Sequence, residues 1–268
     1  MSLIRSYAQP MAANFAKGLS PSDSGGALTE EDLIFARISD ATTAQKALIS
    51  TFITTPEWLK VKACFLFGLP AGPNGALRDL KSNIVAVRTG TTPPVHQPSF
   101  GYHWASVTGS IETGINPSVL GLANNEHWTI SFYTSLIDAG GSRQILLAND
   151  GTTQSRFAHV SDSYLKVQSV GTSMGITARL PAAGETWLVQ RDGNLYANSS
   201  AWINSVDQVK NHAGGGAAAN DQFYLGENPS GVTEIGLDIS MFTVGEAFTD
   251  PATFMTAQKT LLDGLQAI

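Results

Sequence analysis

Residues 186–197 read Thr-Trp-Leu-Val-Gln-Arg-Asp-Gly-Asn-Leu-Tyr-Ala, and this stretch indicates the fold most directly. Two strand-like runs flank Asp192-Gly193, a residue pair that suits the positive φ angles of a type I′ turn. The stretch therefore predicts a β-hairpin with a two-residue turn.

Further runs with the two-residue period of β-strands surround this hairpin. Residues 127–133 alternate, so that Trp128, Ile130 and Phe132 share one face. Trp128 and Trp187 are expected in the core. Similar runs follow at residues 144–147, 155–160, 164–170, 175–180, 223–225 and 235–244. Roughly ten strands at this spacing, without intervening helices, predict an antiparallel sandwich or barrel and not a parallel α/β sheet.

Residues 29–68 instead carry the signals of helices. Thr29 precedes an acidic first turn, which suits both a hydroxyl cap and the helix dipole. A second helix is expected at residues 44–52, after a break and a new cap within residues 40–43. Thr55-Pro56 marks a third start, after which apolar residues recur at spacings of three and four as far as Phe65. The pattern therefore predicts three short helices in this segment.

The chain is accordingly divided into three parts. We expect an extended N-terminal arm at residues 1–28, a helical attachment segment with a linker at residues 29–79, and a sandwich at residues 80–268. Asp250 and Pro251 are expected to cap and open a closing helix. Chain ends are ordered when something holds them, so the arm either docks on a neighbouring subunit or folds back on its own domain.

Composition narrows the classes of function. Charged residues make up 14% of the chain and the net charge is −6, which works against a nucleic-acid-binding surface. No stretch approaches the roughly 18 apolar residues of a membrane span. The N-terminus lacks a continuous apolar run, so export through a signal peptide is not expected. The single cysteine, Cys64, excludes an intrachain disulfide and is expected to be a buried thiol.

Several sequence landmarks follow one another in a recognisable order. They are Phe100-Gly101-Tyr102, the Ser-Ile-Glu-Thr-Gly-Ile-Asn-Pro stretch at 110–117, His127-Trp128, Gly184-Glu185-Thr186-Trp187, residues 223–226, and residues 239–245 with the helix after them. This series resembles the concanavalin A-like (lectin/glucanase, laminin-G-like) domains of tailed-bacteriophage virion proteins, over about residues 80–268. The resemblance implies a mainly β fold. It would be an antiparallel jelly-roll β-sandwich preceded by a short helical segment and an extended arm, and closed by one C-terminal helix.

The same resemblance implies a function and a location. The chain would be a non-enzymatic virion structural protein of the tail-fibre or receptor-binding type, made in the host cytoplasm and located on the phage particle surface. Residues 1–68 would dock on other virion proteins, a homotrimer is expected, and the sandwich would bind host surface glycans. A capsid decoration or head fibre protein is the first alternative. A free-standing bacterial lectin and a degenerate glycoside hydrolase are the others.

A carbohydrate site is predicted in the turn-rich region after the hairpin. Sugar sites pair an aromatic face with amide and carboxylate groups. Trp202 is the candidate platform, with Asn204 and Asp221 as polar partners. Alternatively, Trp202 packs as a core residue beneath the long loop.

No catalytic residue is predicted. Strand acids such as Asp238 and Glu246 are too far apart for the paired carboxylates of glycoside hydrolysis. The five histidines lack the spacing of metal ligands. Neither a metal nor a cofactor is therefore expected.

Overall fold

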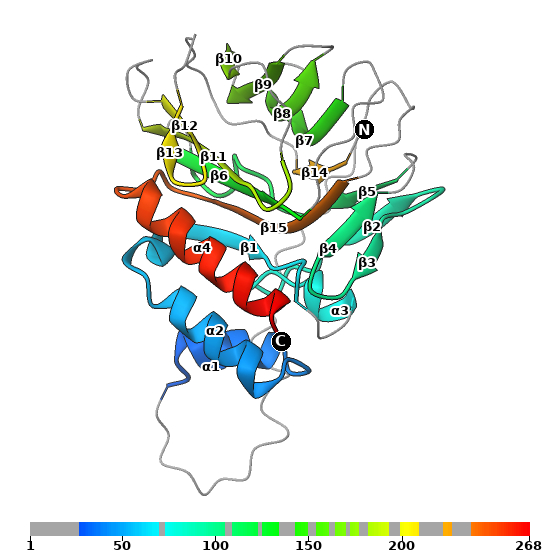
Figure 1. The fold of residues 1–268 in the computed structure, drawn as a ribbon, viewed down its shortest axis with the longest axis vertical. Helices are drawn as coiled ribbons and strands as arrows, with labels where there is room; N and C mark the ends of the chain where they lie inside the picture. The colour runs from blue at the N-terminus through cyan, green and yellow to red at the C-terminus, as the bar shows by residue number, and fades with distance from the viewer. Residues whose placement is uncertain are drawn as a thin grey trace, which may run out of the picture.

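Two antiparallel sheets stack face to face, and a layer of helices covers the outer face of the larger sheet (Figure 1). The structure is a computed structural model that describes residues 27–69, 73–104, 109–122, 125–133, 143–149, 154–160, 164–169, 172–176, 182–192, 199–208, 222–226 and 237–268. The predicted fold class is confirmed, since the chain is mainly β, with a short N-terminal helical region and one C-terminal helix. In these ranges no helix has the length and hydropathy required to cross a membrane.

The larger sheet, here the main sheet, has the strand order β13-β12-β11-β6-β15-β4-β3, and β1 also pairs with β15. Its strands are β1 (Val61–Phe65), β3 (Val95–Gln97), β4 (Gly101–Trp104), β6 (Asn125–Phe132), β11 (Thr186–Asp192), β12 (Ser199–Ile203), β13 (Val206–Asp207) and β15 (Leu237–Gly245).

The smaller sheet, here the second sheet, has the order β10-β9-β8-β7-β14-β5-β2. Its strands are β2 (Val87–Gly90), β5 (Gly109–Glu112), β7 (Arg143–Asn149), β8 (Gln154–Val160), β9 (Tyr164–Ser169), β10 (Thr172–Ile176) and β14 (Tyr224–Leu225). The helices are α1 (Glu30–Arg37), α2 (Thr43–Ile53), the 3-10 helix η1 (Pro56–Lys60), α3 (Pro73–Ala76) and α4 (Pro251–Gln266).

Alternation along the strands divides the side chains of the main sheet between two cores. Trp128, Ile130 and Phe132 pack with Trp187 in the core between the sheets, as the period of residues 127–133 predicts. Leu188 points the other way, into the core beneath the helices. The main sheet is therefore buried on both of its faces.

The helix starts largely follow the predicted capping residues. Thr29 and Thr42 each form a capping box with the residue three positions on. Asp250 accepts a backbone N–H at the start of α4, and a proline opens that helix. Thr55 makes no such cap, since its hydroxyl donates to the carbonyl of Phe52 at 2.8 Å.

The third predicted helix is wrong beyond its first turn. Residues 56–60 form a 3-10 turn, and Val61–Phe65 become β1, which pairs antiparallel with β15. Ala63 lies in the core between the sheets, whereas Cys64 lies beneath the helices. A strand that is buried on both faces reads as an unbroken apolar run, which a helix can produce as well.

The predicted helical segment thus shares its sheet and both cores with the residues that follow it. Its strand β1 pairs with β15 near the C-terminus. Ile34 of α1 and Phe52 of α2 pack in the same core as Leu261 of α4. Residues 1–26 of the predicted arm lie outside the described residues.

The hairpin at residue 186 is present, but its predicted two-residue turn is wrong. Strand β11 pairs with β12, and Arg191 lies opposite Ser199. The partner strand is therefore Ser199–Ile203, and residues 193–198 between the two strands lie outside the described residues.

Candidate functional site: a groove along helix α4

Helix α4 lies across the outer face of the main sheet (Figure 1) and is held there by an apolar stripe. The stripe recurs at helical spacing and comprises Phe254, Met255, Leu261, Leu262 and Leu265. Gln258 lies within the stripe and is fully buried. Its side-chain amide donates to the hydroxyls of Thr129 at 3.2 Å and Ser131 at 3.0 Å. These bonds tie the middle of α4 to β6.

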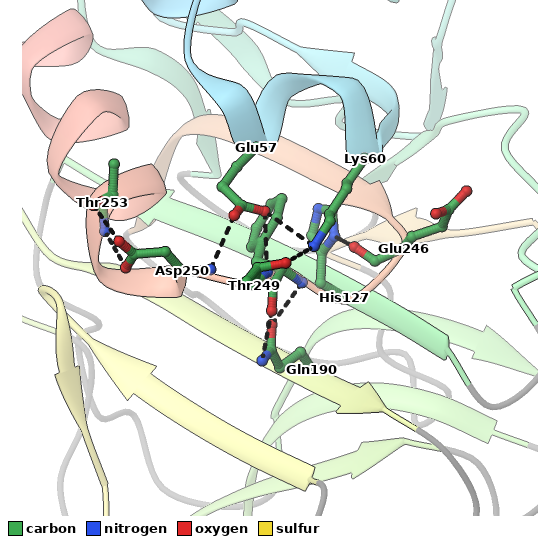
Figure 2. A network of polar contacts seen from close by, with 9 residues as sticks. Glu57, Lys60, His127, Gln190, Glu246, Thr249, Asp250 and Thr253 are labelled. Carbon is green, nitrogen blue, oxygen red and sulfur yellow. Dashed lines mark hydrogen bonds and ion pairs between the residues drawn. The ribbon is translucent and has the colours of Figure 1, made fainter.

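Figure 2 shows the polar network that fixes the start of α4. Glu57 of η1 is buried, and its carboxylate accepts the backbone N–H groups of Thr249 at 3.1 Å and Asp250 at 2.9 Å. Lys60 pairs with Glu57 at 3.4 Å and donates to the Thr249 hydroxyl. The 3-10 helix therefore positions the turn between β15 and α4.

His127 on β6 contacts the same turn. Its Nδ1 donates to the carbonyl of Glu246 at 2.6 Å, and its ring stacks on Phe248 with the centroids 3.7 Å apart. Burial lowers the pKa of His127 to about 3, so the imidazole is neutral near pH 7. A neutral, fully buried ring acts here as a packing and hydrogen-bonding group.

A groove lies between α4 and the turn that joins β12 to β13. It has a volume of about 450 Å³ and is lined by Asn204, Ser205, Met255, Thr256, Lys259, Thr260 and Asp263. The Ser205 hydroxyl bridges the turn and the helix through the Ala252 carbonyl and the Thr256 hydroxyl. Lys259 and Asp263 form an ion pair at 2.8 Å, so the charges of this groove cancel.

A smaller cavity of about 30 Å³ shares Lys259 and Asp263 with the groove as lining residues. Gly184, Thr186 and, on β15, Ser240 also line this cavity. The groove and this cavity are together called the α4 groove. It offers hydroxyl and amide groups to a ligand, beside the buried side chain of Met255.

The structure brings one of the predicted sugar-binding residues to this groove. Asn204 lines it, at a positive φ of 48°, and its side-chain oxygen accepts the Thr186 backbone N–H at 3.0 Å. Trp202 is half-buried against the core beneath the helices, and its Nε1 donates to the Ser200 hydroxyl at 3.0 Å. Asp221 lies outside the described residues.

The sequence prediction missed the helical side of the groove. Thr256, Lys259, Thr260 and Asp263 recur at spacings of three and four, which marks one polar face of α4. That pattern alone does not reveal that the face meets a turn near residue 204. As for metals, the described ranges contain no group of three or more His, Cys, Asp or Glu side chains that could hold an ion.

Comparison with known proteins establishes the fold. No protein-family model and no curated protein matches the sequence. The Trypanosoma rangeli sialidase in complex with sialic acid has a TM-score of 0.56 at 8% identity, over 88% of this chain and 40% of the sialidase. The same sialidase with 2,3-difluorosialic acid, described as a covalent intermediate, has a TM-score of 0.56 at 11% identity, over 84% and 39%. A botulinum neurotoxin type C structure, described as interacting with two ganglioside molecules, has a TM-score of 0.51 at 13% identity, over 77% and 51%.

The chain therefore shares an antiparallel β-sandwich fold with these structures. It covers about two fifths to one half of the chains it matches. The expectation of a non-enzymatic protein is overturned by the sialidase matches. That expectation rested on the absence of known catalytic motifs from the sequence, and an enzyme with the same fold shows that the fold does not separate binding proteins from enzymes.

Proposed function

We propose that the chain binds carbohydrate in the α4 groove, a step that lectins and glycoside hydrolases share. One observation carries the proposal: a groove of about 450 Å³ is lined by hydroxyl and amide side chains of α4 and the β12–β13 turn, with the buried Met255 at its border. Its volume falls within the roughly 300–1,000 Å³ of small-ligand sites. Sugars present many hydroxyls, and such a lining can form hydrogen bonds to them. The sialic acid complex and the ganglioside-interacting toxin, which share the fold, support the proposal.

The charges in the groove favour neutral sugars over acidic ones. Lys259 and Asp263 neutralise each other, and the chain carries a net charge of −6. An acidic sugar would gain no unpaired cation in the groove and would be repelled at long range. We therefore infer that neutral pyranosides bind more tightly than sialylated ones.

A glycan array with a groove-blocking variant tests this function. Thr260→Trp places an indole in the groove and is expected to lower binding at least tenfold. Thr51→Trp on α2 is the matched control, because both threonines are exposed and each donates its hydroxyl to the carbonyl four residues earlier. The control is expected to retain binding. Wild-type protein that binds no glycan, or equal binding by the two variants, would contradict the proposal.

The structure supports the three predicted sugar-binding residues unequally; they are Trp202, Asn204 and Asp221. Asn204 lines the groove and is our candidate amide partner. Trp202 as a stacking platform and Asp221 as a polar partner stay predictions from the sequence.

We also propose that this binding serves a phage virion, as the sequence resemblance implies. We rank a tail-fibre or receptor-binding role first and a capsid decoration or head fibre role second. None of the solved structures compared above is a phage protein. Residues 27–68 pack on the chain's own main sheet where described, so docking would use their outer surface and residues 1–26. A solution mass three times that of one chain would support the homotrimer, and the mass of a single chain would count against it.

A further inference from the structure

A cluster of aromatic and polar side chains lies where β6, β15 and β4 run side by side. Tyr133 follows β6, and its N–H donates to the Asp238 carbonyl on β15 at 2.9 Å. His103 on β4 is the register partner of Asp238. Tyr102 and Trp104 face the core between the sheets, so His103 between them points to the outer face, on which α4 lies.

His103 and Asp238 form a fixed pair. The imidazole Nδ1 lies 2.6 Å from the Asp238 carboxylate, with 28% of the His103 side chain and 4% of the Asp238 side chain exposed. The buried carboxylate orients the ring and its tautomer. Nε2 therefore has a defined direction, and within the described residues no hydrogen bond to it occurs. Such an atom can form a hydrogen bond to a ligand hydroxyl without the entropy cost of first ordering the imidazole.

An aromatic surface lies beside this pair. Phe100 and Tyr133 stack with their centroids 4.1 Å apart and an interplanar angle of 27°, and both side chains are half-buried. A partly exposed ring pair is a surface on which the apolar face of a pyranose can stack. The stack and the imidazole thus offer the two kinds of contact that sugars need.

Ser240 connects this cluster to the α4 groove. It lines the smaller cavity of the α4 groove, and its hydroxyl donates to the Phe100 carbonyl at 2.7 Å. The close approach at this point requires glycine at position 101, where φ is +115° and a Cβ would lie 1.9 Å from the Ile239 carbonyl oxygen. We call Phe100, His103, Tyr133, Asp238 and Ser240 the rim cluster.

We propose that the rim cluster is a second sugar subsite, so that the ligand is an oligosaccharide that extends from the α4 groove to Tyr133 and His103. The inference rests on the proposed function and adds the class of ligand to it. Tyr133 and Phe100 supply the stacking surface and His103 a hydrogen bond. Asp238 is a positioning residue that acts through His103.

Affinity as a function of oligosaccharide length tests this inference on the whole chain. Titrations would use glucose and the cello-, malto- and chito-oligosaccharides of increasing length. We expect wild-type protein to bind the longer members about tenfold more tightly than a single sugar, because they reach the stacked rings. Tyr133→Ala is expected to remove this gain while leaving the affinity for the shortest ligand bound in the groove unchanged. Tyr133→Phe, which keeps the ring, should retain the gain.

Two controls keep the outcome interpretable. Phe35→Ala removes a half-buried ring on α1 and is expected to leave the dependence on chain length intact. The wild-type series needs no variant, so it decides the question even if Tyr133→Ala fails to fold. Equal affinity for short and long members, or a full gain in Tyr133→Ala, would overturn the second subsite while the groove proposal stands. No binding of any probe would overturn the proposed function itself.

Discussion

Replacing Glu57 by alanine is expected to lower the free energy of unfolding by about 3 kcal/mol. The buried carboxylate accepts two backbone N–H groups, those of Thr249 and Asp250, and pairs with Lys60 (Figure 2). Its removal leaves two part-buried backbone N–H groups without this acceptor and Lys60 without its carboxylate partner. The first turn of α4 then loses its attachment to η1, and the groove along the helix should lose ligand affinity as well.

Glu246→Ala is the matched control for this prediction. Glu246 belongs to the same network, but its carboxylate is 42% exposed and pairs with Lys62 at 2.6 Å on the surface. Surface ion pairs contribute about 1 kcal/mol or less, so a small loss is expected. Urea unfolding of both variants measures the difference. Equal losses would show that the buried carboxylate does not anchor α4.

Acidification from pH 7 to pH 5 is expected to remove about 2 kcal/mol of stability through His127 alone. The pKa of His127 is lowered from 6.5 to about 3 by burial, so the unfolded chain takes up a proton that the folded chain does not. The stability is therefore present above pH 6.5 and is lost as the pH falls toward 3. Over that whole range the loss approaches about 5 kcal/mol.

Urea unfolding at pH 7 and pH 5, for wild type and His127→Gln, isolates this contribution. The variant has lower stability at both values but should lack the 2 kcal/mol difference between them. Asp79, whose pKa is raised by burial, titrates with the opposite sign and contributes equally to both proteins. An unchanged pH dependence in the variant would show that His127 is not the group responsible.

The features that were predicted correctly depend on neighbours in the sequence. The capping residues bond to backbone groups within one helical turn, so the neighbouring sequence predicts their roles; they are Thr29, Thr42 and Asp250. The alternation of Trp128, Ile130 and Phe132 likewise follows from the pleat of a single strand. Such signals were enough to predict the sandwich and its closing helix.

The features that were missed depend on contacts between distant segments. Val61–Phe65 form a strand because β15 pairs with them, a contact that overrides the helical spacing. The groove exists because the turn at Asn204 meets Thr256 and its neighbours on α4. His103 and Asp238 lie 135 residues apart in sequence. No local pattern joins such pairs, so the candidate site became visible only in the fold.

The resonance of the Met255 methyl group tests the central claim most directly. Both methionines pack in the core beneath the helices. Of the two, Met255 also lines the α4 groove, whereas Met241 does not appear among the described residues that line it. With methyl-labelled methionine, titration with an oligosaccharide that binds should shift the Met255 signal and leave Met241 in place. Saturable binding that leaves the Met255 signal unmoved would contradict the account.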